Sequence, residues 1–260
     1  FHHKLKLFSI TASEPDTKSK KAMKKINGVL LLIFFALAVS AQTITISEPI
    51  VLRNDIAYNL LGDMGGHTLI FRDRGSSFEV VGLNKAMKES WSKDIELDRR
   101  LPKVLDIIPD DTYFTLLYQY KDRSHTVLKA HRYGPGANLI DSTKIVDLGY
   151  LFYTPSFITL RSEDRSKSLL FFTEKQDVMR AICFDNNEMK TLWQTVIAPQ
   201  DFNFYQNFLE VLVDNQGNMT IITERNNYRT KREEHFYEFF HYQGRSDQLT
   251  RFKLPMEEKL

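Results

Sequence analysis

The chain has 260 residues, of which 42% are hydrophobic and 26% are charged, with one cysteine and a formal charge of +2. A single cysteine excludes an internal disulfide framework, and the length is sufficient for a sizeable hydrophobic core. The nearly balanced charge lacks the basic footprint of nucleic-acid-binding proteins, so we expect no nucleic-acid partner.

The first 41 residues are predicted to lie outside the folded domain. Residues 1–22 precede the first methionine, and we interpret them as upstream sequence that is not native. Residues 23–41 have the basic start, the apolar run and the small-residue cleavage site of a secretory signal peptide. The apolar run is short for a bilayer, so we expect no stable membrane span after cleavage, and a secreted or periplasmic protein.

Removal of this leader would change the charge of the protein. Residues 1–41 hold seven lysines and two acidic residues, so the remaining 28 basic and 31 acidic residues give a formal charge of −3. The basic character of the chain therefore belongs to the leader.

Residues 42–260 repeat a pattern of four short strands four times, which predicts an all-β fold of β-propeller blades. The positions Leu97, Leu148, Ala198 and Leu254 are equivalent in the repeats and lie 51, 50 and 56 residues apart. The predicted blades span about 54–98, 102–148, 155–199 and 207–254. A helical turn at 84–91 is an alternative to the hairpin expected there.

The second strand of each repeat is apolar on both of its faces. These strands are expected at 67–73, 113–120, 168–174 and 219–224. Short β-branched and aromatic runs of this kind suit a strand that is enclosed by neighbouring sheets. Trp91 and Trp193 fall in fourth strands and Cys183 in a third strand, where we expect them to pack between blades.

An aspartate recurs in the turn between the first and second strands. Asp63, Asp110, Asp164 and Asp214 could form a ring of metal ligands, or they could stabilise the turns through their own side chains. Hairpin tips on separate blades splay apart, so we favour the turns and expect no metal site and no cofactor.

Residues 43–49 look like a fourth strand without a blade of its own, because Ile46 lies 51 residues before Leu97. This suggests that the four visible blades are part of a larger propeller. Closure of four complete blades into a ring is the competing interpretation.

The loops between blades hold the candidate ligand-binding residues. Two of these loops are aromatic, and the loops between second and third strands are basic and polar. Aromatic rings beside arginine suit stacking on a sugar or gripping a peptide, although the rings could instead wedge between blades. The candidate residues are Tyr150, Phe152, Tyr153, Phe202, Phe204, Tyr205 and Arg123.

The repeats resemble the blades of secreted bacterial β-propellers at the level of pattern, without the motifs of a specific family. No catalytic signature is present, so no catalytic residue is proposed and the chain is not identified as an enzyme. We expect an exported binding module for a protein, peptide or glycan. The alternative is a propeller-based hydrolase or lyase, or the gating propeller of a larger enzyme.

Overall fold

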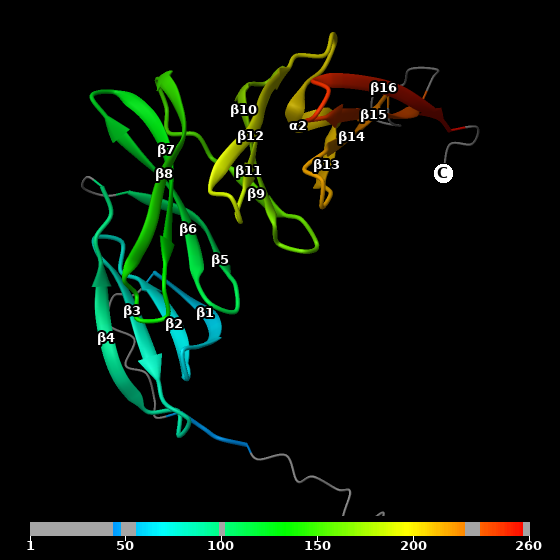
Figure 1. Ribbon diagram of the computed structural model, residues 1–260. Helices are drawn as coiled ribbons and strands as arrows, with labels where there is room; N and C mark the ends of the chain where they lie inside the picture. The colour runs from blue at the N-terminus through cyan, green and yellow to red at the C-terminus, as the bar shows by residue number, and fades with distance from the viewer. Residues whose placement is uncertain (1–43, 48–55, 99–101, 227–234, 257–260) are drawn as a thin grey trace, which may run out of the picture. The chain divides into compact units, whose positions relative to one another are not determined.

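The computed structural model describes residues 44–47, 56–98, 102–226 and 235–256 (Figure 1). Its strands form four antiparallel sheets, each of four strands that lie side by side in chain order. Consecutive sheets pack against one another through their faces. This arrangement confirms the predicted fold of four propeller blades.

The sheets are numbered here in chain order. Sheet 1 contains β1 (Ala57–Met64), β2 (His67–Asp73), β3 (Phe78–Leu83) and β4 (Glu89–Ile95). Sheet 2 contains β5 (Lys103–Pro109), β6 (Phe114–Asp122), β7 (His125–Tyr133) and β8 (Leu139–Tyr150). Sheet 3 contains β9 (Ile158–Arg161), β10 (Lys167–Lys175), β11 (Val178–Asp185) and β12 (Lys190–Ile197). Sheet 4 contains β13 (Phe208–Val213), β14 (Met219–Arg225), β15 (Phe236–Gln243) and β16 (Gln248–Pro255).

Residues 1–45 form a unit separate from residues 46–260. The upstream sequence and the signal peptide lie outside the described residues and stay predictions. Residues 44–47 belong to no strand, and Ile44 and Ile46 are exposed, so the expected fourth strand is not formed over these four residues; the rest of the segment 43–49 lies outside the described residues. Within the part of the chain that the structure describes, no helix is long and apolar enough to cross a membrane.

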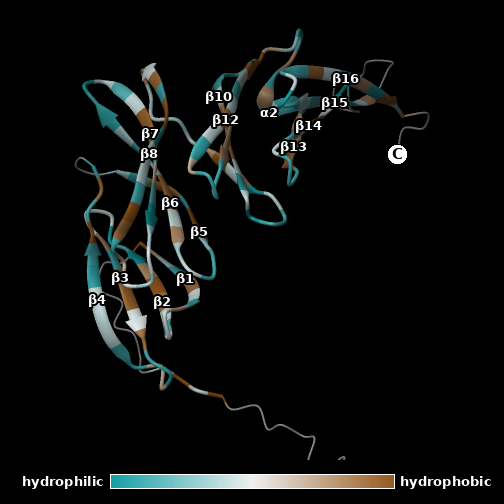
Figure 2. Ribbon diagram, in the orientation of Figure 1, coloured by the Kyte–Doolittle hydropathy of each residue, from teal (hydrophilic) through white to brown (hydrophobic). Residues whose placement is uncertain are grey.

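Strand β10 shows the two-sided burial that its sequence predicts. Leu169 and Phe171 belong to the core shared by sheets 3 and 4, whereas Leu170 and Phe172 belong to the core shared by sheets 2 and 3. Alternate side chains of a strand point to opposite faces, so an apolar residue at every position fills both cores. In sheet 1, the hydrophobic colour likewise lies on β3 and is sparse on the outer strand β4 (Figure 2).

Trp193 and Cys183 pack between sheets 3 and 4, as expected from their positions. The Trp193 indole Nε1 donates a hydrogen bond to the Gly217 carbonyl oxygen at 2.8 Å, which joins the outer strand of sheet 3 to a turn of sheet 4. Burial raises the pKa of the Cys183 thiol to about 12, because the thiolate would lose its hydration. Such a thiol stays protonated at neutral pH and behaves as a small apolar side chain.

The recurrent aspartates stabilise turns. Asp214 Oδ1 accepts backbone N–H bonds from Gln216 at 2.9 Å and Asn218 at 2.8 Å. Asp164 Oδ1 accepts one from Ser166 at 3.0 Å, and Asp63 accepts from the Thr68 hydroxyl. The preferred interpretation of the repeat as turn chemistry is confirmed at these positions.

Two short segments between strands have a defined local structure. Residues 84–88 form a hairpin turn, because the Asn84 side chain accepts from the backbone N–H groups of Ala86 and Lys88. An unexpected one-turn helix, α2 (Phe204–Asn207), lies in the linker before sheet 4. Asn203 caps it by accepting the Tyr205 N–H at 3.0 Å, which is the local reason for the turn.

A partly buried network of polar side chains connects the end of sheet 1 to sheet 2. The Tyr118 hydroxyl donates to Asp98 at 2.7 Å, and the two ring nitrogens of His131 lie 2.9 Å from the Tyr118 and Tyr133 hydroxyls. Lys129 also bonds Asp98. Burial lowers the pKa of His131, and the neighbouring Lys129 charge lowers it further, while Asp98 opposes the shift. The imidazole is therefore neutral in the folded protein.

This network predicts that acid destabilises the protein from about pH 6.5 downward. Below the ordinary histidine pKa of 6.5, the unfolded state binds a proton that folded His131 does not. Stability is therefore present above that pH and decreases as the pH falls toward the lowered folded pKa. The unfolding free energy, measured in urea between pH 5 and pH 7.5, should depend less on pH in His131→Gln than in the wild type. Equal slopes for His131→Gln and the wild type would contradict the account.

Candidate functional site

The linkers after sheet 2 and after sheet 3 lie at the same end as the β6–β7 and β10–β11 hairpins. In a four-stranded meander, the second hairpin and the exit of the chain are at one end of the sheet, so topology brings these loops together. Contacts confirm the placement. Lys121, in the β6–β7 hairpin, directs its Nζ to the Leu151 carbonyl oxygen at 3.3 Å, in the linker that follows.

The first linker presents aromatic rings to solvent. Tyr150 and Phe152 contact edge to face, with ring centroids 4.9 Å apart and an interplanar angle of 75°. Phe152 is 92% exposed, and Tyr150 is also exposed. Tyr153 is partly covered, and its hydroxyl donates to the Glu174 carbonyl oxygen at 2.7 Å. Two rings are therefore free to contact a partner, while the third is anchored on the neighbouring hairpin.

The second linker divides its aromatic residues between the core and the surface. Phe202 is 6% exposed and lies under the Arg225 guanidinium, whose carbon is 5.3 Å from the ring centroid. Phe204 stacks on Phe208 at 4.5 Å, at the edge of the core between sheets 3 and 4. Tyr205 is 75% exposed. Phe202 and Phe204 thus pack as the wedge interpretation expects, and Tyr205 remains at the surface.

The tip of the β10–β11 hairpin is held between the two linkers. The Gln176 carbonyl oxygen accepts from Phe204 N–H at 2.6 Å, and the Gln176 side chain accepts from Asn203 Nδ2 at 3.1 Å. Tyr153 binds the same hairpin from the other linker. Burial raises the pKa of Tyr153, followed by the charge of Glu174, and Tyr205 adds to the shift because it lies nearby. We call the four exposed or half-exposed rings here the aromatic end: Tyr150, Phe152, Tyr153 and Tyr205.

Two pairs of polar side chains border the aromatic end. Arg180 Nε lies 2.6 Å from Glu174, and His125 Nδ1 lies 3.2 Å from Asp147. Arg123, the basic candidate from the sequence, is exposed at the tip of the β6–β7 hairpin, where its φ of 47° marks a tight turn. It lies two residues before His125, whose strand partner is Tyr150.

A cleft of about 490 Å³ adjoins this end between the outer strands of sheets 2 and 3. Asp147 and Arg180 line it, together with Gln194 and Val196 of β12. Asp147 pairs with His125 and Arg180 pairs with Glu174, next to the hairpins just described, and Asp247 of the β15–β16 turn also lines the cleft. Sequence analysis missed Asp147 and Arg180, because nothing in their local sequence shows that residues of two different repeats share a cleft.

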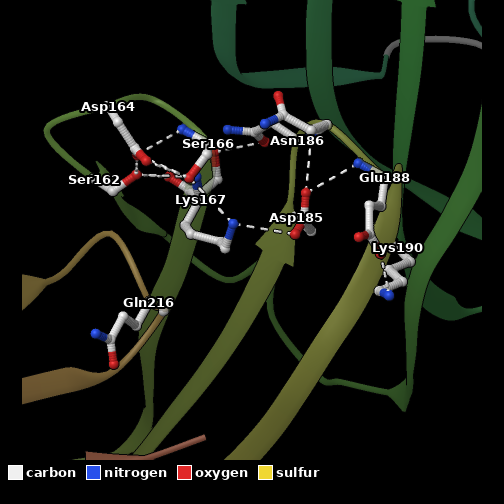
Figure 3. A network of polar contacts seen from close by, with 12 residues as sticks. Ser162, Asp164, Ser166, Lys167, Asp185, Asn186, Glu188, Lys190 and Gln216 are labelled. Atoms are coloured by element: carbon white, nitrogen blue, oxygen red, sulfur yellow. Dashed lines mark hydrogen bonds and ion pairs between the residues drawn. The ribbon is translucent and has the colours of Figure 1, made fainter. Parts of the chain in front are cut away.

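The opposite end of sheets 3 and 4 carries a polar cleft of about 560 Å³. Figure 3 shows a network of polar contacts beside it, in which Lys167 points to Asp185, and Ser162, Asp164 and Ser166 gather in one turn. Lys167 Nζ lies 3.1 Å from Asp185, and Asp185 Oδ1 accepts the Glu188 N–H at 3.0 Å. These charges satisfy one another, so we call this surface the polar end and regard its contacts as structural. In the described residues, no group of three histidine, cysteine or acidic side chains could hold a metal ion.

Comparisons with known proteins find similarity to solved structures only at the level of the fold. No protein-family model matches the chain, and no curated protein matches it. Two similar solved structures are the WD40 domain of SCAP from fission yeast and the β-propeller domain of the Trilobed protease from Pyrococcus furiosus. The first has a TM-score of 0.45 and 10% identity over 79% of this chain and 53% of the other. The second has a TM-score of 0.41 and 11% identity over 76% of this chain and 56% of the other. The chain thus spans about half the length of each of these structures.

Proposed function

We propose that this chain is a propeller interaction module that binds a peptide segment of a partner protein at the aromatic end. The observation that carries the proposal is the pair of strongly exposed rings, Phe152 and Tyr205, on linkers that are fixed to one hairpin. Exposed aromatic side chains on a rigid frame lose little entropy on binding and dominate contact energy at interfaces.

The arrangement of the rings favours a peptide over a sugar. Tyr150 and Phe152 meet at 75°, so together they form a corner and no flat platform. A sugar ring stacks on a flat aromatic face, whereas a corner encloses an apolar peptide side chain. The adjoining cleft, with Asp147 and Arg180, offers one acceptor and one donor for the groups of an extended peptide backbone.

The test removes the two exposed rings and leaves the packed residues of the linkers unchanged. Wild type and the double variant Phe152→Ala, Tyr205→Ala are applied to a peptide array and a glycan array, and the dissociation constant of the tightest-binding peptide is measured. We expect the double variant to bind that peptide at least about tenfold more weakly, because each ring contributes as an exposed anchor. Its melting temperature should stay close to that of the wild type.

Phe204→Ala is the matched control. Its ring packs in the linker, so this variant should lose stability and retain peptide affinity when it is assayed below its melting temperature. Equal peptide affinity of the wild type and the double variant would contradict the proposal. Binding to glycans and to no peptide would show that the ligand is a glycan. Cleavage of a bound peptide or glycan would favour the hydrolase or lyase alternative.

Export of the module is part of the same proposal and rests on residues 23–41 alone. The first residue of the mature protein tests it: N-terminal sequencing should find Gln42, and a mature protein that retains the leader would contradict it.

A further inference from the structure

Sheet 4 has one face that packs on sheet 3 and one that is largely exposed. Val211, Ile221 and Phe240 point toward sheet 3 and are buried in the shared core. Strand pairing places Ile222, Phe239 and Phe252 in one row across the opposite face. Tyr237 and Leu254 form the neighbouring row of that face. We call these five residues the outer face of sheet 4.

This face carries several accessible apolar side chains, and the exposed Glu210 extends the row of Ile222 and Phe239 at its first strand. Phe239 and Phe252 stack with ring centroids 4.8 Å apart and an interplanar angle of 7°. Phe252 is 49% exposed, and Leu254 is also exposed. Apolar side chains gathered on one sheet face mark a surface that another element covers.

Equivalent faces in the preceding sheets show what covers them. In sheet 3, the row Leu160, Leu169, Cys183 and Trp193 crosses all four strands and is packed by sheet 4. In sheet 2, Leu117 and Ala130 form the corresponding buried pair, which is packed by sheet 3. The covering element is each time the next four-stranded sheet of the chain.

Polar residues that border the outer face also fit such an interface. Thr220 and His241 lie in the row beside Ile222 and Phe239. The interface between sheets 2 and 3 buries Thr115 and Gln119 in the same way, so a mixed row is compatible with sheet-on-sheet packing in this chain. A partner that presented only charged side chains would leave the stacked phenylalanines uncovered.

We propose that the outer face of sheet 4 is a packing interface for a fifth four-stranded antiparallel sheet, which the full-length polypeptide carries. This fifth sheet would present an apolar face to sheet 4, as each sheet does to its neighbour in the three interfaces described. The inference rests on side chains of sheet 4 and does not depend on the binding of a peptide at the aromatic end.

The test compares Phe252→Lys with Val196→Lys in the 260-residue chain and in the full-length natural polypeptide. Val196 is 53% exposed on an outer strand of sheet 3, so it is matched to Phe252 in exposure. In the 260-residue chain, both variants should change the melting temperature little. In the full-length polypeptide, Phe252→Lys should lower it by several degrees and Val196→Lys should not.

Hydrogen exchange provides a second readout that needs no variant. Amides of residues 236–255 should exchange more slowly in the full-length polypeptide than in the 260-residue chain. The proposal would be overturned if the amides exchanged at equal rates in the two polypeptides and Phe252→Lys left the melting temperature of the full-length polypeptide unchanged. A full-length polypeptide without a further sheet would also overturn it. A dimer of the 260-residue chain that Phe252→Lys dissociates would also overturn it, because a second copy would then be the occupant.

Discussion

Replacement of Glu238 by alanine is expected to lower the free energy of unfolding by about 3–5 kcal/mol, the range for removal of one partner of a buried ion pair. Glu238 has no exposed side-chain surface and accepts a hydrogen bond from Arg225 Nε at 3.2 Å. Arg251 bonds the other carboxylate oxygen. Without Glu238, the partners that the described residues offer to the buried Arg225 charge are the Gln200 and Asp201 carbonyl oxygens and the ring of Phe202.

Urea unfolding of Glu238→Ala and of the double variant Arg225→Met, Glu238→Leu separates the two causes of the loss. If an unpaired buried charge dominates, the double variant should recover a large part of the lost stability, because apolar residues of similar size replace the pair. An unfolding free energy of Glu238→Ala within about 1 kcal/mol of the wild type would contradict the buried pairing.

Replacement of Phe171 by alanine is expected to have an effect of similar size, about 3–5 kcal/mol, because it leaves a cavity where a large side chain was fully buried. Phe171 lies in the core between sheets 3 and 4 and contacts Phe208, whose ring centroid is 5.6 Å away. Phe208 begins sheet 4, so the cavity would loosen the packing between two sheets as well as within one.

Phe152→Ala is the matched control for Phe171→Ala, since it removes the same side chain from an exposed position. Its unfolding free energy should stay close to that of the wild type. Urea denaturation of both variants measures the difference. Equal losses for the two variants would show that exposure does not distinguish these positions, which would contradict the described packing.

The parts of the fold that the sequence predicts depend on the pattern of apolar residues along each strand and on the polar side chains in the turns. The run Leu169 to Phe172 has an apolar residue at every position, which suits a strand that two neighbouring sheets enclose. Asp164 and Asp214 act within a few residues of their own position, so their role in turns is visible locally. These features are properties of short segments, which explains why sequence alone was sufficient for them.

The sequence did not predict in the same way which aromatic candidate residues are buried and which are exposed. Phe202 and Tyr205 stand three residues apart in one aromatic loop, yet Arg225 covers the first and solvent surrounds the second. The difference arises from a charge on β14 and from the cap of α2, where Asn203 turns the chain. The Asn203 cap acts within two residues of its own position, whereas the contact with Arg225 depends on tertiary packing.

The most direct test of the binding account is amide hydrogen exchange of the wild type with and without the tightest-binding peptide of the array. We predict that the peptide slows exchange at residues 150–153 and 174–178 and at 203–207, which together frame the aromatic end. Protection confined to the polar end, at residues 162–167 and 185–190, would contradict the account and move the binding site to the opposite end of the sheets.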